Sequence, residues 1–461
     1  MAEILDSTLR EGEQTPLVNL MVDEKIEIAR RLDQIGVEMI EAGDPSVSPN
    51  VFQAVKRIAN LGLKAEIVAH SLATRSGIAK AKECNADRVV VFYPTSKIHL
   101  DAKMNKNQEE AITWIVDHVR YARELGLKVR YTPEDATRTD FDFLVRVCNA
   151  AIEAGADRIS FADTLGIMTP NRMFEQVTEL RARLAPCKID LHCHDDYGLA
   201  LANALEGIRA GADCIHTTVN GMGERTGIPD LSETILAMRN LMGMDHYQLH
   251  PLMDLSAYVE KVTGFFVAPN KPITGVNAFS HKSGVHTNGV LKDPHTYENF
   301  DPSLLGRERH IVIDKYTGKR AVEARLAEFN VTVTPDELTL IVDEIKKIGD
   351  ERKFLHDADI IDVAERITGQ LLDIFPKEIN AIVMIAVESH VYTTSVVRRL
   401  KNLKQVSNVY ELTGDYDITA YVKVATTLDL NNFIEEMRAM PGVKNTDTRV
   451  VLKKYTEMVK S

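Results

Sequence analysis

The sequence predicts an α/β protein in which a (β/α)₈ barrel is followed by an irregular segment, a helical connector and a small βαββαβ module. Up to about Met244, short β-rich runs alternate with amphipathic stretches at helical spacing. About eight such βα units with short connections close a parallel sheet into a barrel. From about Ile379 the order becomes strand, helix, two strands, helix and strand, which is typical of a ferredoxin-like module.

Each barrel strand is expected where a β-rich run lies between turn signals. The runs are Glu3–Asp6, Glu38–Glu41, Lys64–Ala69, Arg88–Phe92, Lys128–Thr132, Arg158–Ala162, Lys188–His192 and Asp213–Thr217. Helical spacing marks the intervening segments, among them Val22–Ile35, Val51–Leu61, Glu109–Leu125, Phe141–Ala154 and Arg172–Leu184. A doubly wound open sheet is the competing topology. The GxGxxG and GxxxxGKS/T nucleotide loops are both absent from the sequence.

The remaining chain is divided at two expected boundaries. The 461 residues exceed a typical barrel by about 200, so the prediction is a barrel over 1–245, a connecting subdomain over 246–375 and a module over 376–461. Residues 264–320 are rich in Gly, His, Lys, Asn and Pro, which indicates a long irregular segment, and such segments are usually functional. Helices are expected to start near Thr334 and Asp357. The module's expected elements are Ala381–Ser389, Thr394–Leu403, Val406–Thr413, Asp417–Val424, Leu428–Met437 and Thr446–Lys453.

Composition excludes several classes of protein. With 55 basic and 67 acidic residues the formal net charge is −12, and no long basic run occurs, so nucleic-acid binding is not expected. The longest apolar run, Ala381 to Val387, is too short to span a bilayer, and the charged Glu3 and Asp6 do not fit a secretory leader. The expectation is a cytoplasmic protein without a membrane partner. The five cysteines include no CxxC pair and are expected to be buried thiols.

Polar residues cluster where the predicted strands end, which is where barrels place their sites. His192 and His194 are spaced i, i+2 at the end of one strand, so both imidazoles are expected on the same side. Two imidazoles and one carboxylate leave coordination positions of a divalent metal open for a substrate. Asp6 and Glu11, at the end of the first strand, are both candidates for the carboxylate.

Three motifs together resemble one family. Asp6-Ser-Thr-Leu-Arg-Glu-Gly-Glu-Gln14, His192-Cys-His-Asp195 and Gly223-Glu-Arg-Thr-Gly227 are similar to the DRE-TIM metallolyases, in the branch that performs acetyl-CoA-dependent Claisen condensation. The resemblance implies that Glu11, His192 and His194 bind a divalent metal, which could be Mg, Mn, Zn or Co. It also implies that Arg10 holds the 2-oxo group of the substrate and stabilises its developing oxyanion.

The second substrate depends on the charge of the pocket. Homocitrate synthases condense 2-oxoglutarate, whose distal carboxylate needs a cation, whereas isopropylmalate synthases accept an apolar tail. Arg130 and His70 resemble the homocitrate synthase pattern, and a guanidinium matches a carboxylate in bidentate geometry. Arg130 could instead be a structural, salt-bridged arginine. Val90 stands where an aspartate is expected in homocitrate synthases, so isopropylmalate synthase, or a dual-substrate enzyme, is the alternative.

The resemblance assigns further roles within the site. Thr164 would bind the proximal carboxylate, Thr132 and Glu41 would form the pocket wall, and Gln14 would lie behind the metal ligands. A base must take a proton from the acetyl methyl group, a task that suits histidine near neutral pH. The segment from His281 to His286 resembles the family's lid, which reaches into the partner subunit's site; His286 is the expected base, with Tyr297 and Glu134 as its helpers. A homodimer or a higher homo-oligomer is therefore expected.

Residues 379–461 resemble the RAM module, the ligand-binding domain of Lrp/AsnC regulators. Such modules bind an amino acid, and the turn formed by Gly414, Asp415, Tyr416 and Asp417 is the candidate effector site. Because homocitrate begins the 2-aminoadipate route to lysine, lysine is the expected effector. The module could instead serve oligomerisation only. A non-catalytic amino-acid sensor is the hypothesis from another class of protein, and the presence of Arg10, Glu11, His192, His194 and His286 together speaks against it.

Overall fold

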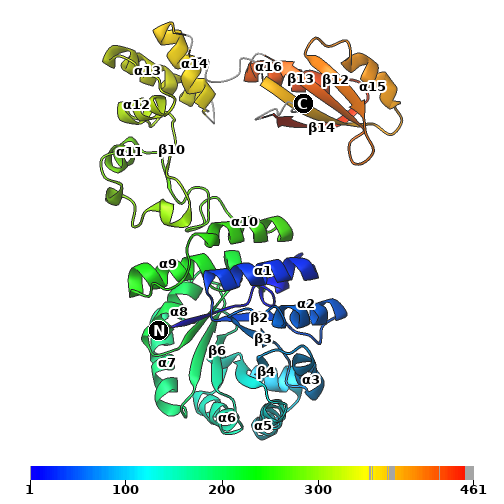
Figure 1. Ribbon diagram of the computed structural model, residues 1–461, viewed down its shortest axis with the longest axis vertical. Helices are drawn as coiled ribbons and strands as arrows, with labels where there is room; N and C mark the ends of the chain where they lie inside the picture. Colours follow the sequence, from blue (N-terminus) through cyan, green and yellow to red (C-terminus); the bar gives the residue numbers. More distant parts are fainter. Residues whose placement is uncertain are drawn as a thin grey trace, which may run out of the picture. The chain divides into compact units, whose positions relative to one another are not determined.

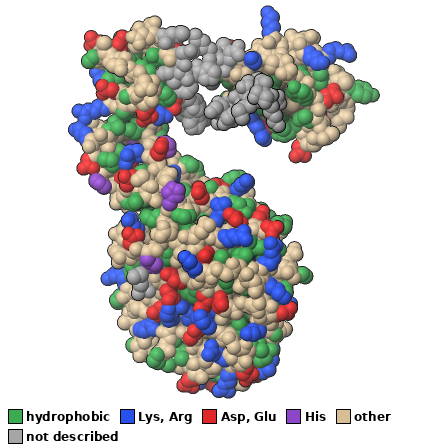
Figure 2. Space-filling view, viewed as in Figure 1, with side chains coloured by type: hydrophobic (Ala, Val, Ile, Leu, Met, Phe, Trp, Pro, Cys, Tyr) green, Lys and Arg blue, Asp and Glu red, His purple; other side chains and the backbone are tan. Residues whose placement is uncertain are grey.

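The computed structural model describes residues 2–351, 355, 357–370, 372, 379–424 and 426–451 (Figure 1). They fall into two compact units. The first consists of Met1–His281 with Pro294–His310, and the second of Lys282–Asp293 with Ile311–Ser461. Among the described helices, none is both long and apolar enough to cross a membrane. Acidic and basic side chains are interspersed over the face of the first unit seen in Figure 2.

Eight parallel strands close into a barrel in the first unit. Each strand pairs with the next one along the chain, and β1 pairs with β8 in register Glu3 to Cys214. The strands are β1 (Glu3–Asp6), β2 (Met39–Gly43), β3 (Glu66–Ala69), β4 (Arg88–Pro94), β5 (Lys128–Glu134), β6 (Arg158–Asp163), β7 (Lys188–Cys193) and β8 (Cys214–Thr217). The parallel order brings all carboxyl ends to one mouth of the barrel, which positions the site described below.

Helices surround the strands (Figure 1). They are α1 (Val22–Ile35), α2 (Pro49–Ala59), α3 (Arg75–Glu83), the short α4 (Lys97–His99), α5 (Gln108–Glu124), α6 (Phe141–Glu153), α7 (Pro170–Arg183), α8 (Ala200–Arg209), α9 (Leu231–Met242) and α10 (Pro251–Thr263). Side-chain caps explain several starts. Ser48 accepts a hydrogen bond from Val51 N at the start of α2, and Asn107 and Glu110 form a capping box at α5.

The apolar residues of the strands and helices form one large core between the two layers. A second, small cluster of buried apolar side chains, contributed by barrel strands, consists of Leu5, Met39, Val68, Val90 and Cys214. Charged side chains are buried as well, including Glu41, Arg130, Arg158 and Asp190. Burial of so many charges requires partners for each.

The chain after the barrel contains more regular structure than expected. Residues 264–320, predicted to be irregular, include the paired strands β9 (Ser280–His281) and β10 (His310–Ile311) and the helix α11 (Gly284–Val290). Glycine and asparagine are poor helix formers, so the helix propensity of this segment did not indicate α11. The connector helices are α12 (Lys319–Glu328), α13 (Pro335–Glu351) and α14 (Asp357–Thr368), which share a core of their own. The expected starts near Thr334 and Asp357 are confirmed.

The C-terminal module is an antiparallel sheet of order β12-β13-β11-β14 with two helices. Its elements are β11 (Ile379–Val387), α15 (Thr393–Leu400), β12 (Val406–Glu411), β13 (Ile418–Val424), α16 (Thr427–Arg438) and β14 (Val443–Val450). The predicted βαββαβ order is confirmed, and the module's core consists of its own residues alone. The last strand lies earlier than Thr446–Lys453, and residues 452 and 453 lie outside the described residues, as does the proposed boundary at 375.

Candidate active site

A cavity of about 740 Å³ lies at the carboxyl ends of the barrel strands. Its walls combine polar and charged side chains from all parts of the barrel's sequence. Ten residues expected in the site line it: Arg10, Glu11, Gln14, His70, Arg130, Thr132, Glu134, Thr164, His192 and His194. The fold therefore brings together side chains that lie far apart in the sequence, from Arg10 to His194.

A tight turn after β1 carries two of these residues. The backbone amides of Arg10 and Glu11 both donate to Ser7 O, at 3.1 and 2.7 Å. The buried Lys25 on α1 supports the turn from below, because its Nζ donates to Leu9 O at 3.2 Å and to Glu13 Oε2 at 2.5 Å. The turn thereby directs Arg10 and Glu11 into the cavity.

Glu11, His192 and His194 form a group in which one potential ligand atom of each residue lies within 4.8 Å of the others. His192 Nε2 is 3.9 Å from Glu11 Oε2, and Glu11 Oε1 accepts a hydrogen bond from Glu224 N at 3.0 Å. His194 Nδ1 is buried and has no hydrogen-bond partner within the described part of the chain. Two imidazoles and a carboxylate with an unpartnered buried nitrogen fit a divalent metal.

The protonation states agree with that donor set. Burial, reinforced by the other imidazoles and Arg10, lowers the pKa of His192 well below its usual value, and burial also lowers the pKa of His194. Both rings are therefore neutral near pH 7 and keep a lone pair for a ligand. The alternative carboxylate, Asp6, lies elsewhere: it accepts hydrogen bonds from Thr8 N at 2.9 Å and Thr217 Oγ1 at 3.3 Å. Burial raises the pKa of Asp6 to about 7.

Two arginines share the buried carboxylate of Glu41. Arg10 Nε is 2.8 Å from Glu41 Oε2, and Arg130 Nη2 is 2.6 Å from Glu41 Oε1. Arg10 also pairs with Glu11. Burial by itself would raise the pKa of Glu41, but the charges of Arg10 and Arg130 hold it well below the usual range. Glu41 thus stays ionised and orients both guanidinium groups from behind the cavity wall.

Arg130 combines the two roles that the sequence left open. It is buried and paired with Glu41, as a structural arginine would be, and it also lines the cavity. Its Nε has no hydrogen-bond partner among the described residues. The neighbouring strand β4 places Val90 in register with Arg130, and Val90 is buried in the small apolar cluster of the barrel strands.

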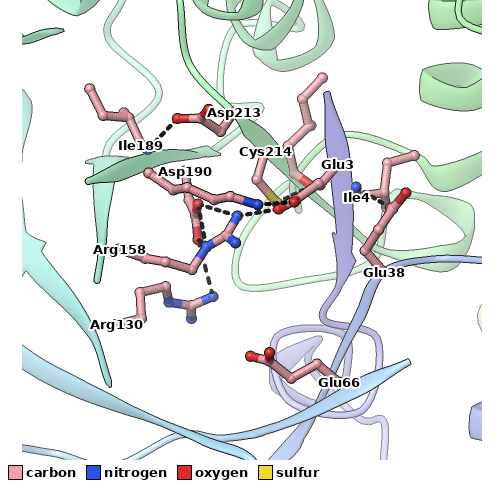
Figure 3. A network of polar contacts seen from close by, with 12 residues as sticks. Glu3, Ile4, Glu38, Glu66, Arg130, Arg158, Ile189, Asp190, Asp213 and Cys214 are labelled. Carbon is pink, nitrogen blue, oxygen red and sulfur yellow. Dashed lines mark hydrogen bonds and ion pairs between the residues drawn. The ribbon is translucent and has the colours of Figure 1, made fainter. Parts of the chain in front are cut away.

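A second layer of charge lies behind Arg130 (Figure 3). Asp190 Oδ2 is 4.0 Å from Arg130 Nη1, and both Asp190 oxygens accept from Arg158 Nε at 2.9 and 3.1 Å. Arg158 continues to Glu3, with its Nη2 2.7 Å from Glu3 Oε2. Ion pairs therefore run without interruption from Arg10 through the barrel interior to the opposite mouth.

The remaining predicted residues occupy the other wall. Glu134 forms two hydrogen bonds to Lys103 Nζ at 2.8 and 2.9 Å, and Thr164 Oγ1 accepts from Asp135 N at 2.9 Å. Thr132 Oγ1 is buried without a hydrogen-bond partner in the described chain. His70 lies 3.8 Å from Asp44.

The Gly223–Gly227 motif closes the cavity beside the metal-ligand group. Gly223 N donates to Thr15 Oγ1 at 2.8 Å, and Arg225 pairs with Asp196 at 2.7 Å. Gly227 has a φ of 82°, and a Cβ there would lie 1.8 Å from Gly221 O. Only glycine fits this position, which keeps Glu224 N close to Glu11.

The cavity wall also includes residues to which the sequence analysis gave no role, among them His216, Lys103 and Arg225. His216 follows Cys214 by two positions in β8, so strand alternation could have placed it on the inner face. Lys103 lies in the short π-helical segment Leu100–Met104 after β4 and follows no pattern that the sequence offers. Burial and the charge of Arg130 lower the pKa of His216 to about 4, so its ring is neutral near pH 7.

The other candidates are Tyr297, His286 and the turn from Gly414 to Asp417. Tyr297 belongs to the first unit and is half-exposed, whereas His286 lies on α11 in the second unit. Their catalytic roles stay predictions. The turn from Gly414 to Asp417 joins β12 and β13, and Asp417 Oδ2 accepts from Val387 N at 2.7 Å.

Family models match three consecutive parts of the chain. Residues 1–259 match the HMGL-like family, 273–353 the "homocitrate synthase post-HMGL domain-like" family and 380–460 the Lrp/AsnC ligand-binding domain. Among solved structures, an HMG-CoA lyase of Bacillus subtilis matches 57% of this chain and 94% of its own, with 22% identity and a TM-score of 0.52. A hydroxymethylglutaryl-CoA lyase of Pseudomonas aeruginosa matches 58% and 94%, with 20% identity and the same TM-score. The barrel is thus that of an HMGL-like protein.

Full-length relatives narrow the class. The homocitrate synthase of Sulfurisphaera tokodaii is 46% identical over 456 residues, which is 98% of this chain and 99% of that protein. The homocitrate synthase of Saccharolobus solfataricus is 45% identical with the same coverage. The chain therefore belongs to the homocitrate synthase family.

Proposed function

We propose that this protein condenses acetyl-CoA with 2-oxoglutarate to form homocitrate and CoA. The observation that carries the proposal is the single cavity in which the Glu11, His192 and His194 group faces Arg10 while the buried Arg130 lines another part of the wall. A 2-oxo acid with a distal carboxylate fits this arrangement, because its 2-oxo end would bind at the metal and Arg10 and its distal carboxylate at Arg130. The names of the full-length relatives support the same reaction.

Glu11, His192 and His194 would hold the metal, and its charge would polarise the 2-oxo group. Mg, Mn, Zn and Co all accept such nitrogen and oxygen ligands. Thr164 would bind the proximal carboxylate through its hydroxyl. Thr132, His70 and Gln14 complete the wall around the substrate.

Bond formation is assigned to the protein's own acids and bases. His286 takes a proton from the acetyl methyl group, with Glu134 and Tyr297 assisting. The methyl carbon then attacks the 2-oxo carbon, and the carbonyl oxygen becomes an alkoxide that Arg10 stabilises until it is protonated. Water hydrolyses the resulting thioester, which releases homocitrate and CoA and makes the reaction effectively irreversible.

A panel of 2-oxo acids tests the assignment by CoA release. Arg130→Met should lower kcat/KM for 2-oxoglutarate roughly 100-fold, the size of one or two charge-assisted hydrogen bonds, and should affect 2-oxoisovalerate much less. Arg146→Met, at an exposed arginine paired with Glu109, is the matched control. If 2-oxoisovalerate outpaces 2-oxoglutarate in the wild-type enzyme, the proposed substrate is wrong.

Val90 favours a second candidate. It is apolar and in register with Arg130, at a position where an aspartate is expected in homocitrate synthases. An isopropylmalate synthase would show the higher kcat/KM for 2-oxoisovalerate, whereas an enzyme that accepts both acids would show comparable values for the two. The same panel decides between them.

We also propose a homodimer in which His286 serves the partner's cavity. Arg10→Ala and His286→Ala would each be inactive alone. If the two variants are unfolded and refolded together, about a quarter of the activity should return, because half of the dimers are mixed and each contains one intact site. Absence of any recovery would assign His286 to its own subunit or to another role.

The C-terminal module is proposed to bind lysine as an end-product inhibitor, with the Gly414–Asp417 turn as part of the site. Because its core is separate from the other two, a chain ending at residue 375 should keep the barrel intact. Lysine should inhibit CoA release by the full chain and not by the shortened one. Unchanged inhibition would place the lysine site elsewhere and leave the module a role in oligomerisation.

A further inference from the structure

His216 connects the two charged regions of the cavity. It lies on β8, is 1% exposed and lines the cavity wall. Its Nδ1 is 3.1 Å from His192 Nδ1, and its Nε2 is 3.1 Å from Arg130 Nη1 and 3.5 Å from Asp190 Oδ2. None of the roles assigned above uses this imidazole.

The position of one proton decides which of these contacts are hydrogen bonds. A neutral imidazole carries a single N–H, so one ring nitrogen donates and the other accepts. If Arg130 Nη1 donates to His216 Nε2, the proton of His216 is on Nδ1 and is donated to His192 Nδ1. His192 then carries its own proton on Nε2, the nitrogen that faces Glu11.

A metal on His192 Nε2 requires the opposite arrangement. His192 must then carry its proton on Nδ1 and donate it to His216 Nδ1, which places the proton of His216 on Nε2. That N–H points to Asp190 and can no longer accept from Arg130. One donor of Arg130 Nη1 therefore loses its partner in the protein.

We propose that His216 is a positioning residue whose tautomer couples metal binding at His192 to the release of Arg130 Nη1 for the distal carboxylate of the substrate. The inference rests on the proposed function, because it takes that substrate to be a 2-oxo dicarboxylate. Binding is then ordered: the metal binds first, and its binding frees a donor of the Arg130 guanidinium for a dicarboxylic acid.

The surroundings keep Arg130 in the cavity wall while the proton moves. Arg130 Nη2 stays bonded to Glu41 at 2.6 Å, so the guanidinium can turn Nη1 from His216 toward the cavity without leaving the wall. Asp190 is fixed by Arg158, as Figure 3 shows, and remains available as the acceptor for His216. The switch needs a change of tautomer and this turn of the guanidinium, and no movement of the backbone.

Calorimetry with two matched acids isolates this coupling. 2-Oxoglutarate and 2-oxopentanoate chelate a metal in the same way, and only the first has a distal carboxylate. In the wild type, saturating Mn²⁺ should improve the affinity for 2-oxoglutarate more than that for 2-oxopentanoate, by an excess of roughly tenfold that reflects one charge-assisted hydrogen bond. Through-space attraction by the metal is common to wild type and variants, so the change in the excess reports on His216.

His216→Asn is the informative variant. Its amide oxygen takes the place of Nδ1 and still accepts from His192, whereas nothing replaces Nε2. Mn²⁺ affinity should stay within about threefold of wild type, and the tenfold excess for 2-oxoglutarate should vanish. His216→Ala removes both contacts and should also weaken Mn²⁺ binding about 10- to 100-fold, as expected for loss of a partner to a ligating histidine.

A control histidine separates positioning from general loss of packing. His118 on α5 is also buried and bonds Trp114 O at 2.8 Å, away from the cavity wall. His118→Asn should leave the excess unchanged. If His216→Asn keeps the excess within twofold of wild type, or if the wild type shows none, the coupling is refuted. A wild-type, Mn²⁺-loaded protein that does not prefer 2-oxoglutarate to 2-oxopentanoate would instead overturn the proposed substrate.

Discussion

Asp6→Asn should change how the stability of the barrel depends on pH. The carboxyl is fully buried, and its pKa is raised from the usual 3.8 to about 7. Between these two values the unfolded chain has lost the proton and the native protein has kept it, so native stability falls as pH rises from about 4 and levels off above 7. A difference of about three pKa units corresponds to a loss on the order of 4 kcal/mol. An asparagine has no proton to lose, so the variant should not show this decline.

The protein has one tryptophan, Trp114, and it lies on α5 of the barrel, so its fluorescence follows this unit alone. Urea unfolding of wild type and Asp6→Asn is compared at pH 5 and pH 8 with a chelator present. The variant should gain about 2.6 kcal/mol of stability relative to wild type between these pH values, because pH 5 already lies above the lower end of the window. Asp23→Asn, at an exposed carboxylate, is the control. Parallel pH profiles for wild type and Asp6→Asn would refute the assignment of a protonated buried acid.

Three further outcomes are expected. Arg158→Met should lower the barrel's stability by about 3–5 kcal/mol, because it leaves Asp190 buried with its main partner removed, whereas the exposed Arg209→Met should not; urea midpoints measure both, and equal midpoints would contradict the burial argument. Removal of divalent metal with a chelator should abolish CoA release and lower the free energy of unfolding, by about 2.7 kcal/mol relative to metal at 100 times its Kd, and restored metal should reverse both effects. Gly227→Ala should cost more than about 3 kcal/mol and weaken metal binding, whereas Gly243→Ala, which meets no atom within 4 Å, should cost only about 1 kcal/mol. Similar losses of stability in the two variants would show that backbone strain, and not the close approach of Gly227 to Gly221, determines the cost of the substitution.

The barrel was predictable because its signal is local. Each strand is a short β-rich run and each helix has its own spacing, so the order of elements follows without knowledge of any long-range contact. The ends were less accurate: β5 continues to Glu134 because Pro133 and Glu134 pair with the extended end of β4. Helix α11 was missed because two glycines in seven residues disfavour a helix that the surrounding structure imposes.

The candidate metal-ligand group was partly predictable for a similar reason, since the i, i+2 spacing of His192 and His194 at the end of a strand indicates two imidazoles on one side. The partners behind them were not. His216 meets His192 from the adjacent strand, and Asp190 meets Arg158 and Arg130 across neighbouring strands. Which residues of the inner face contact one another depends on the stagger between neighbouring barrel strands, and a single sequence does not reveal this stagger. The sequence therefore indicated the candidate ligands, whereas their supporting network is visible only in the structure.

The row of alternating charges inside the barrel restricts how this protein can evolve. Arg10, Glu41, Arg130, Asp190 and Arg158 each neutralise the next, so loss of one leaves a neighbouring charge without its partner. Such positions can drift only when two of them change together or when the whole row is replaced by apolar residues. Divergent homologues should accordingly show paired exchanges at these positions, and a change of substrate at Arg130 should be accompanied by a compensating change at Glu41 or Asp190.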